Sequence, residues 1–83
     1  MKRTELKRWC SILTNQQAAV LKMIWIRSLF GKWTSYRDMH KIANTPTARI
    51  TELRQAGVEF KQRKVSVMSN SGQRMVYVEE FMI

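Results

Sequence analysis

The sequence predicts a small α+β domain in which four helices precede a β-hairpin. Three observations lead to this prediction. The chain has 83 residues, enough for one domain with one small core. Up to Gly57 the apolar residues recur every three or four positions, whereas after it they alternate with polar ones. Capping and turn residues mark the borders between these stretches.

Composition favours a polyanionic partner and excludes several classes of protein. Fifteen Lys and Arg against six Asp and Glu give a net charge of +9, which attracts nucleic acid first and an anionic membrane surface second. One Cys and one His cannot build a disulfide framework or a Cys/His zinc site within one chain. No apolar run reaches the length of a membrane span, and the basic N-terminus does not resemble a secretory signal. We therefore expect a cytoplasmic protein without metal or cofactor.

Residues 1–13 predict a basic amphipathic helix or arm ahead of a domain that spans residues 14–83. Leu6, Trp9 and Leu13 fall on one face of this helix. Two interpretations are open. The helix closes the core of the domain, or it serves as a basic arm on nucleic acid or as a dimer contact through these three residues, with Phe81–Ile83 as a further candidate surface.

The second helix is expected to begin after Thr14. Thr14 and Gln17 fit a capping box, in which each side chain satisfies a free backbone N–H group of the other. The helix should end near Phe30, because Gly31 suits a left-handed position. We expect Lys32–Thr34 to be extended and to form a very short strand.

The third helix is expected to begin after Ser35, which forms a second capping pattern with Asp38. Asn44 should end this helix, since Asn tolerates a positive φ. Its predicted buried stripe consists of Met39, Ile42 and Ala43.

The fourth helix, about residues 45–56, has the clearest borders. Thr45 is the expected N-cap, Pro46 suits the first helical position, and Gly57 suits the end. The predicted inward face consists of Pro46, Ile50, Leu53 and Gly57. The opposite face carries the small polar residues Thr47, Ala48, Thr51 and Gln55, with Arg49 and Arg54 on the flanks.

The pattern of the remaining residues predicts a basic hairpin over about residues 58–79. Val58, Phe60, Val65 and Val67 alternate with polar residues. The segment 69–72, Ser-Asn-Ser-Gly, suits a hairpin loop, and the segment 74–78 forms the returning strand.

Two short helices joined by two residues and followed at once by a basic hairpin outline a winged helix-turn-helix. The stretch Thr45–Phe60, TPTARITELRQAGVEF, resembles the segment of these proteins that runs from the recognition helix into the wing. It is most similar to small helix-turn-helix proteins of phages and prophages, which carry a similar Ala-Arg-Ile…Leu-Arg…Ala-Gly run. The resemblance covers about residues 15–80. It implies a three-helix core with a C-terminal β-hairpin wing, to which residues 1–13 add an extra helix.

The fourth helix also suits DNA on physical grounds. The major groove admits one α-helix, and only small polar side chains let the helix approach the base edges. The predicted contacts of this recognition helix are Thr45, Thr47, Ala48, Arg49, Thr51, Arg54 and Gln55. The alternative is a solvated helix face without a partner, which the charge of +9 disfavours.

The wing and the third helix would bind the DNA backbone and the minor groove. The predicted wing contacts are Lys61, Arg63, Lys64, Ser69, Asn70, Ser71, Gln73 and Arg74. The predicted backbone contacts of the third helix are Tyr36, Arg37 and Lys41. Two alternatives are that the hairpin only promotes solubility and that Arg37 pairs with Asp38 or Glu52.

These predictions favour a double-stranded DNA-binding protein that regulates transcription, in the host cell cytoplasm if a phage encodes it. One alternative is a phage-encoded protein–protein module that binds and inhibits a host or defence complex. Another is a DNA-bending architectural or excision factor. A homodimer would suit a two-fold site. An enzyme is not expected, because the sequence offers no paired carboxylates near a base, no Gly-rich phosphate loop and no nucleophile–base pair.

Overall fold

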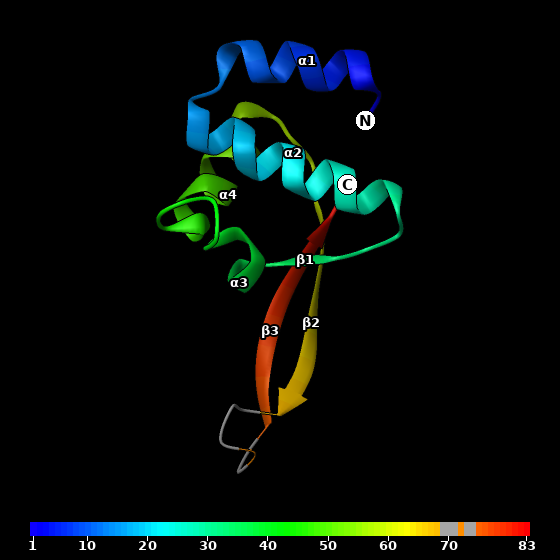
Figure 1. Ribbon diagram of the computed structural model, residues 1–83, viewed down its shortest axis with the longest axis vertical. Helices are drawn as coiled ribbons and strands as arrows, with labels where there is room; N and C mark the ends of the chain where they lie inside the picture. The colour runs from blue at the N-terminus through cyan, green and yellow to red at the C-terminus, as the bar shows by residue number, and fades with distance from the viewer. Residues whose placement is uncertain (69–71, 73–74) are drawn as a thin grey trace.

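The computed structural model describes residues 1–68, 72 and 75–83, with only the backbone of Val76. In this part of the chain, a β-hairpin follows the helices, and a short strand between the second and third helices joins it in a small antiparallel sheet (Figure 1). The helices are α1 (Arg3–Ile12), α2 (Asn15–Leu29), α3 (Tyr36–Met39) and α4 (Pro46–Ala56). The strands are β1 (Thr34–Ser35), β2 (Lys61–Met68) and β3 (Met75–Met82).

The core lies between α2, α4 and the C-terminal end of β3. Its largest fully buried side chains come from all three of these elements and from α3, and include Phe81, Leu21, Ile24, Met39, Ile50 and Leu53. Helix α1 lies across α2 on the side away from the hairpin (Figure 1) and contributes one buried residue, Leu6. The α+β prediction is therefore confirmed, with one small core beneath α2.

The sheet has the strand order β1-β3-β2. Thr34 of β1 pairs with Phe81 of β3, so the short strand fastens the C-terminal end of the hairpin to the helices. The hairpin is in register from Lys61 opposite Met82 to Met68 opposite Met75. Beyond its base it projects away from the body (Figure 1), and the molecule extends 45 Å along its longest axis.

The predicted helix starts are confirmed at α2 and α3. Thr14 and Ser35 each accept a hydrogen bond from the backbone N–H three residues on, and Gln17 and Asp38 complete the two capping boxes. Gly31 has a φ of 71° directly after α2, as expected for a residue that ends a helix.

The prediction for the third helix is wrong at its C-terminal end. Helix α3 stops at Met39, and residues 40–42 form turns instead of a further helical turn. Ile42 is consequently 40% exposed and not part of the buried stripe, although Ala43 is buried. Within the described residues, the only residue other than glycine with a positive φ is Thr45, at 49°, and not Asn44.

Three predictions about the strands are also corrected. Strand β2 begins at Lys61, because Val58 is buried in the core before the hairpin starts. Strand β3 continues to Met82, and Phe81 is fully buried. Phe81 therefore packs inside the chain and offers no surface to a second copy. The short strand lies at Thr34–Ser35, slightly later than expected.

Candidate nucleic-acid interface

Helix α4 is held by one face and presents the other to solvent. Pro46, Ile50 and Leu53 are buried against the core, as the helical spacing predicts, whereas Gly57, also predicted to face inward, is exposed. Pro46 occupies the first turn and Gly57 ends the helix with a φ of 112°. Thr47, Thr51 and Gln55 of the opposite face are exposed and Ala48 is half-buried. The structure therefore presents small and polar side chains along one side of a firmly packed helix.

The two ends of this face differ in their hydrogen bonds. The Thr51 hydroxyl donates to the Thr47 carbonyl at 3.0 Å, so only its lone pairs and methyl group are free. Gln55 has no hydrogen-bond partner in the described part of the chain. Thr45 is exposed, and its left-handed backbone leaves its side chain without a capping bond. Gln55 is thus the side chain of this face with unused amide donors and an unused acceptor.

Arg49, one of the predicted DNA contacts, is already bound within the chain. It forms an ion pair with Glu52 and donates to Gln16 Oε1 of α2 at 3.2 Å. Hydrogen bonds from Arg49 and from Gln17 lower the pKa of Glu52. Because the hydrogen bond to Gln16 joins α4 to α2, Arg49 acts mainly inside the chain. Its charge also offsets Glu52, the acid that α4 carries.

Arg54 joins α4 to the hairpin. Its guanidinium donates to Gln62 Oε1 at 2.7 Å and lies 5.5 Å from the centre of the Phe81 ring. The ring of Tyr36 packs edge-on against the same Phe81 ring at 5.1 Å. Helix α3, helix α4 and the hairpin therefore meet around Phe81. Arg54 remains exposed, so it can reach a phosphate as well as hold this junction.

A hollow of about 640 Å³ lies between α3 and the hairpin. Its lining consists of Tyr36, Arg37, His40, Lys64, Tyr77, Val78 and Glu79. Burial, followed by the negative charge of Glu79, raises the pKa of Tyr36, so the phenol stays protonated. The hollow therefore combines basic side chains with aromatic hydroxyls beside α4, a combination that suits a phosphate backbone.

The two alternative partners of Arg37 are bound to other arginines. Asp38 pairs with Arg27 at 3.4 Å, and Glu52 pairs with Arg49. Arg37 itself is exposed and has no ion pair among the described residues. Lys41 is exposed as well. Arg37 therefore lines the hollow with its charge unpaired within the described residues, and Lys41 is exposed in the turn that follows α3.

The cations of β2 fall into two groups. Arg63 binds Glu80 at 2.9 Å and lies 4.3 Å from the centre of the Trp33 ring, so it fastens the base of the hairpin. Lys61 and Lys64 are exposed and have no ion pair in the part of the chain described. Lys64 is opposite Glu79 in the register. Five further predicted wing contacts lie outside the described residues: Ser69, Asn70, Ser71, Gln73 and Arg74.

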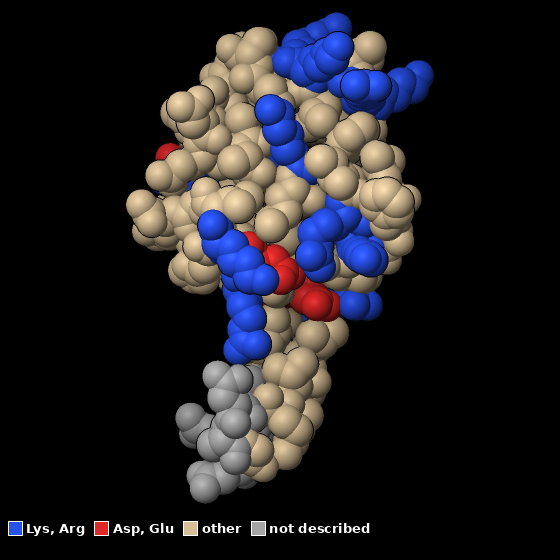
Figure 2. All heavy atoms as spheres, in the orientation of Figure 1, with Lys and Arg blue, Asp and Glu red and all other residues tan. Residues whose placement is uncertain are grey.

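The face seen in Figure 2 is not uniformly basic. Lys and Arg side chains gather at the top of the body and again where the hairpin leaves it, where they flank a small acidic group. The positive charge near the hairpin therefore comes in separate patches. Such an arrangement suits discrete phosphate contacts better than a continuous basic groove.

Helix α1 packs against the core through the residues that were predicted to form a dimer contact. Leu6 is only 8% exposed, and Trp9 and Leu13 pack against the core. The Trp9 ring also approaches Gly57 so closely that a Cβ there would lie 3.5 Å from it. Leu6 therefore has little surface left for a second copy, and the position of α1 supports its interpretation as a helix that closes the core.

Three residues of this region were not predicted: Gln16, Gln62 and Trp33. Each contacts an arginine that belongs to another element of the fold. No local pattern marks such partners, since Gln and Trp occur equally well on surfaces without them.

The comparisons with known proteins agree with this architecture. Residues 32–83 match the family described as the winged helix-turn-helix domain, and this stretch is more than half of the chain. The chain belongs to the winged helix-turn-helix domain family. No curated protein and no solved structure is significantly similar to it.

The family match supports DNA as the partner. The matched residues begin after α2, so α1 and α2 lie outside them. Over the residues that the structure describes, no helix is both long and apolar enough to cross a bilayer. No group of three or more His, Cys, Asp or Glu side chains could hold a metal ion there.

Proposed function

We propose that the protein binds double-stranded DNA in a sequence-specific manner and regulates transcription. This is the role implied by its resemblance to small phage and prophage regulators. Helix α4 enters the major groove, α3 binds the phosphate backbone, and the hairpin lies along the backbone or the minor groove. The observation that carries this proposal is the exposed face of α4. It offers small and polar side chains to a groove that admits one helix.

The surroundings of α4 support the same docking. Three free cations are exposed here: Arg37 on α3, Lys41 in the turn after it and Lys64 on β2. Arg54 of α4 is also exposed, although it donates to Gln62. In this arrangement Gln55 pairs with a base edge, with adenine as its preferred partner. The free cations bind phosphates and give affinity without reading sequence.

A salt titration tests DNA binding directly. Fluorescence anisotropy with a labelled random-sequence duplex should give an affinity that falls linearly on a double logarithmic plot, with a slope of about −0.9 per phosphate bound. Absence of binding at low salt would contradict the proposal. A slope near zero would mean that the free cations do not bind phosphates.

A protein–protein module is the second candidate, and an exposed apolar patch favours it. Ile26, Leu29 and Phe30 lie at helical spacing near the end of α2, and Phe30 is 75% exposed. Patches of this kind often bind proteins. Co-purification with a host protein that survives nuclease treatment, and that Phe30→Ser abolishes, would support this candidate. The Ile12→Ser variant, which alters another exposed apolar side chain on α1, serves as the matched control.

A further inference from the structure

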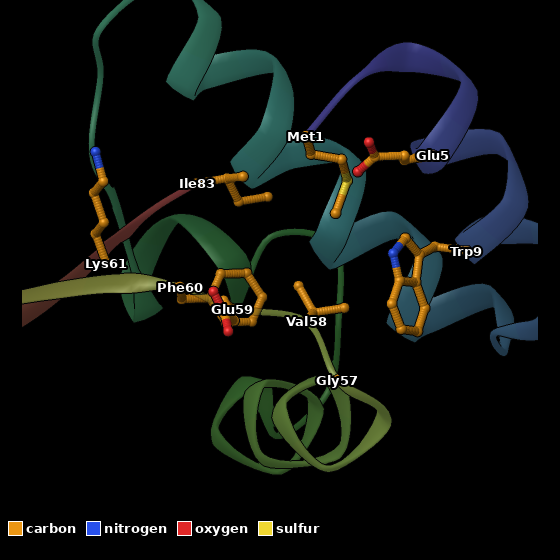
Figure 3. A pocket seen from close by; sticks show the side chains of 9 residues that line it. All are labelled: Met1, Glu5, Trp9, Gly57, Val58, Glu59, Phe60, Lys61 and Ile83. Atoms are coloured by element: carbon orange, nitrogen blue, oxygen red, sulfur yellow. The ribbon is translucent and has the colours of Figure 1, made fainter.

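A second hollow, of about 510 Å³, lies where α1 meets the chain between α4 and β2. Its lining consists of Met1, Glu5, Trp9, Gly57, Val58, Glu59, Phe60, Lys61 and Ile83. Figure 3 shows Met1 and Trp9 pointing from one side toward Val58 and Phe60 on the other. This volume falls in the range of sites for small organic ligands.

The lining of this hollow combines aromatic and apolar side chains with charged ones. Trp9 and Phe60 are half-buried and pack against the core, while Val58 is buried. The partly buried rings have faces that can take up an apolar body, and they attract a cation placed over them. The hollow therefore suits a ligand with hydrocarbon groups around a positive charge.

Two carboxylates lie at the rim, although the whole chain has a net charge of +9. Glu5 and Glu59 line the hollow, and neither has an ion pair within the described ranges. Two positive groups oppose them, the N-terminal amino group of Met1 and Lys61, and the Lys61 side chain extends away from Trp9 (Figure 3). Helix α4 also ends at Ala56, next to Gly57, so its negative end adds to the attraction for a cation.

We propose that this hollow binds a small organic cation with an apolar body, such as a quaternary or aromatic ammonium compound. Glu5 and Glu59 hold the positive charge, and Trp9 and Phe60 enclose the hydrocarbon part. Met1, Glu5 and Trp9 lie outside the range that matches the family, whereas the opposite wall lies inside it. The site is therefore built by the N-terminal helix that this chain adds to the winged domain, and it does not depend on DNA binding.

Nuclear magnetic resonance of the full chain without DNA tests this site. The probe is benzyltrimethylammonium, compared with neutral benzyl alcohol and anionic benzenesulfonate. The cation should bind most tightly and shift the indole N–H signal of Trp9, which the Trp9→Phe variant identifies. Equal or tighter binding of either other compound would overturn the proposal, as would shifts that leave Trp9 unchanged.

Charge variants separate recognition of the cation from general binding to the hollow. The double variant Glu5→Gln, Glu59→Gln should weaken the cation about three- to tenfold, because exposed ion pairs contribute modestly. It should leave benzyl alcohol unaffected. The matched control Glu79→Gln removes a carboxylate that does not line this hollow and should leave cation binding unchanged. Unaltered cation binding by the folded double variant would contradict the proposal.

Discussion

Helix α4 and the hairpin are neighbouring parts of the proposed DNA surface, but they are held in place by different forces. Helix α4 buries Pro46, Ile50 and Leu53 in the core. Strand β2 has only one half-buried side chain, that of Val65, and its other residues are exposed. The hairpin owes its orientation to contacts at its base, where Phe81 of β3 is buried, Arg54 binds Gln62 and Arg63 binds Glu80.

This difference indicates which part of the surface carries precision and which carries adaptability. A helix packed through a core face holds its side chains in a defined position, as reading of base edges requires. A two-stranded ribbon beyond its base gains little from burial. We therefore infer that α4 provides specificity and that the hairpin adjusts to the course of the backbone.

The largest effect is expected from a substitution on the side of α4 that packs against the core. Leu53→Ala should lower the free energy of unfolding by about 2–5 kcal/mol, because it removes a fully buried side chain and leaves a cavity. DNA affinity should fall with the folded fraction. Urea denaturation followed by circular dichroism measures the change. Gln55→Ala on the exposed side of the same helix is the control and should alter stability little; a similarly small loss for Leu53→Ala would mean that α4 is not held by the core.

A smaller effect is expected at the start of α3. Asp38 accepts hydrogen bonds from the Ser35 backbone N–H and hydroxyl, both at 3.1 Å. Burial alone would raise the pKa of Asp38, but these bonds and the charge of Arg27 outweigh it and lower the pKa. Asp38→Asn should therefore cost about 1 kcal/mol of stability at pH 7.

The pH dependence of this cost follows from the lowered pKa. The charged form of Asp38 stabilises the fold at pH values above the unfolded pKa of about 3.9, and this contribution disappears as the pH falls through the lower folded value. The stabilities of wild type and Asp38→Asn should thus converge as the pH falls below about 4. A difference that stays constant from pH 7 to pH 3 would contradict the assigned role.

The smallest effects are expected when a free cation of β2, Lys64, and a bound one, Arg63, are each replaced by alanine. Lys64→Ala should reduce the slope of the salt titration by about 1 and leave stability unchanged. Arg63→Ala should leave that slope unchanged and lower stability by about 1 kcal/mol or less, since it loses a partly exposed ion pair. Anisotropy titrations and urea denaturation of both variants measure these effects. The reverse pattern would show that Arg63 binds DNA and Lys64 does not.

Local patterns predicted the helix borders well, because capping depends on residues close in the sequence. The boxes at Thr14 and Ser35 and the ends at Gly31 and Gly57 all follow this rule. The extent of α3 could not be predicted in this way. Its C-terminal residues have helical spacing, but the chain turns after Met39 to bring α4 into the core. Ile42 is exposed as a result.

The partners of the arginines could not be predicted from the sequence, for a different reason. Arg49, Arg54 and Arg63 resemble the free cations in the sequence, yet the fold places Gln16, Gln62 and Glu80 of other elements beside them. Only tertiary structure distinguishes a basic residue that fastens two elements from one that is available to a ligand. The burial of Phe81 illustrates the same limit, because the pairing of β1 with β3 draws it into the core.

The central claim is that α4 reads bases, and selection of bound DNA from a random pool tests it most directly. The selected site and a scrambled duplex are then compared for wild type, Gln55→Ala and Lys64→Ala. We predict an enriched site for which Gln55→Ala loses roughly tenfold of the preference, since one bidentate base contact contributes about 1–3 kcal/mol, while Lys64→Ala weakens both duplexes equally. Absence of an enriched site, or a preference that Gln55→Ala leaves intact, would contradict the account.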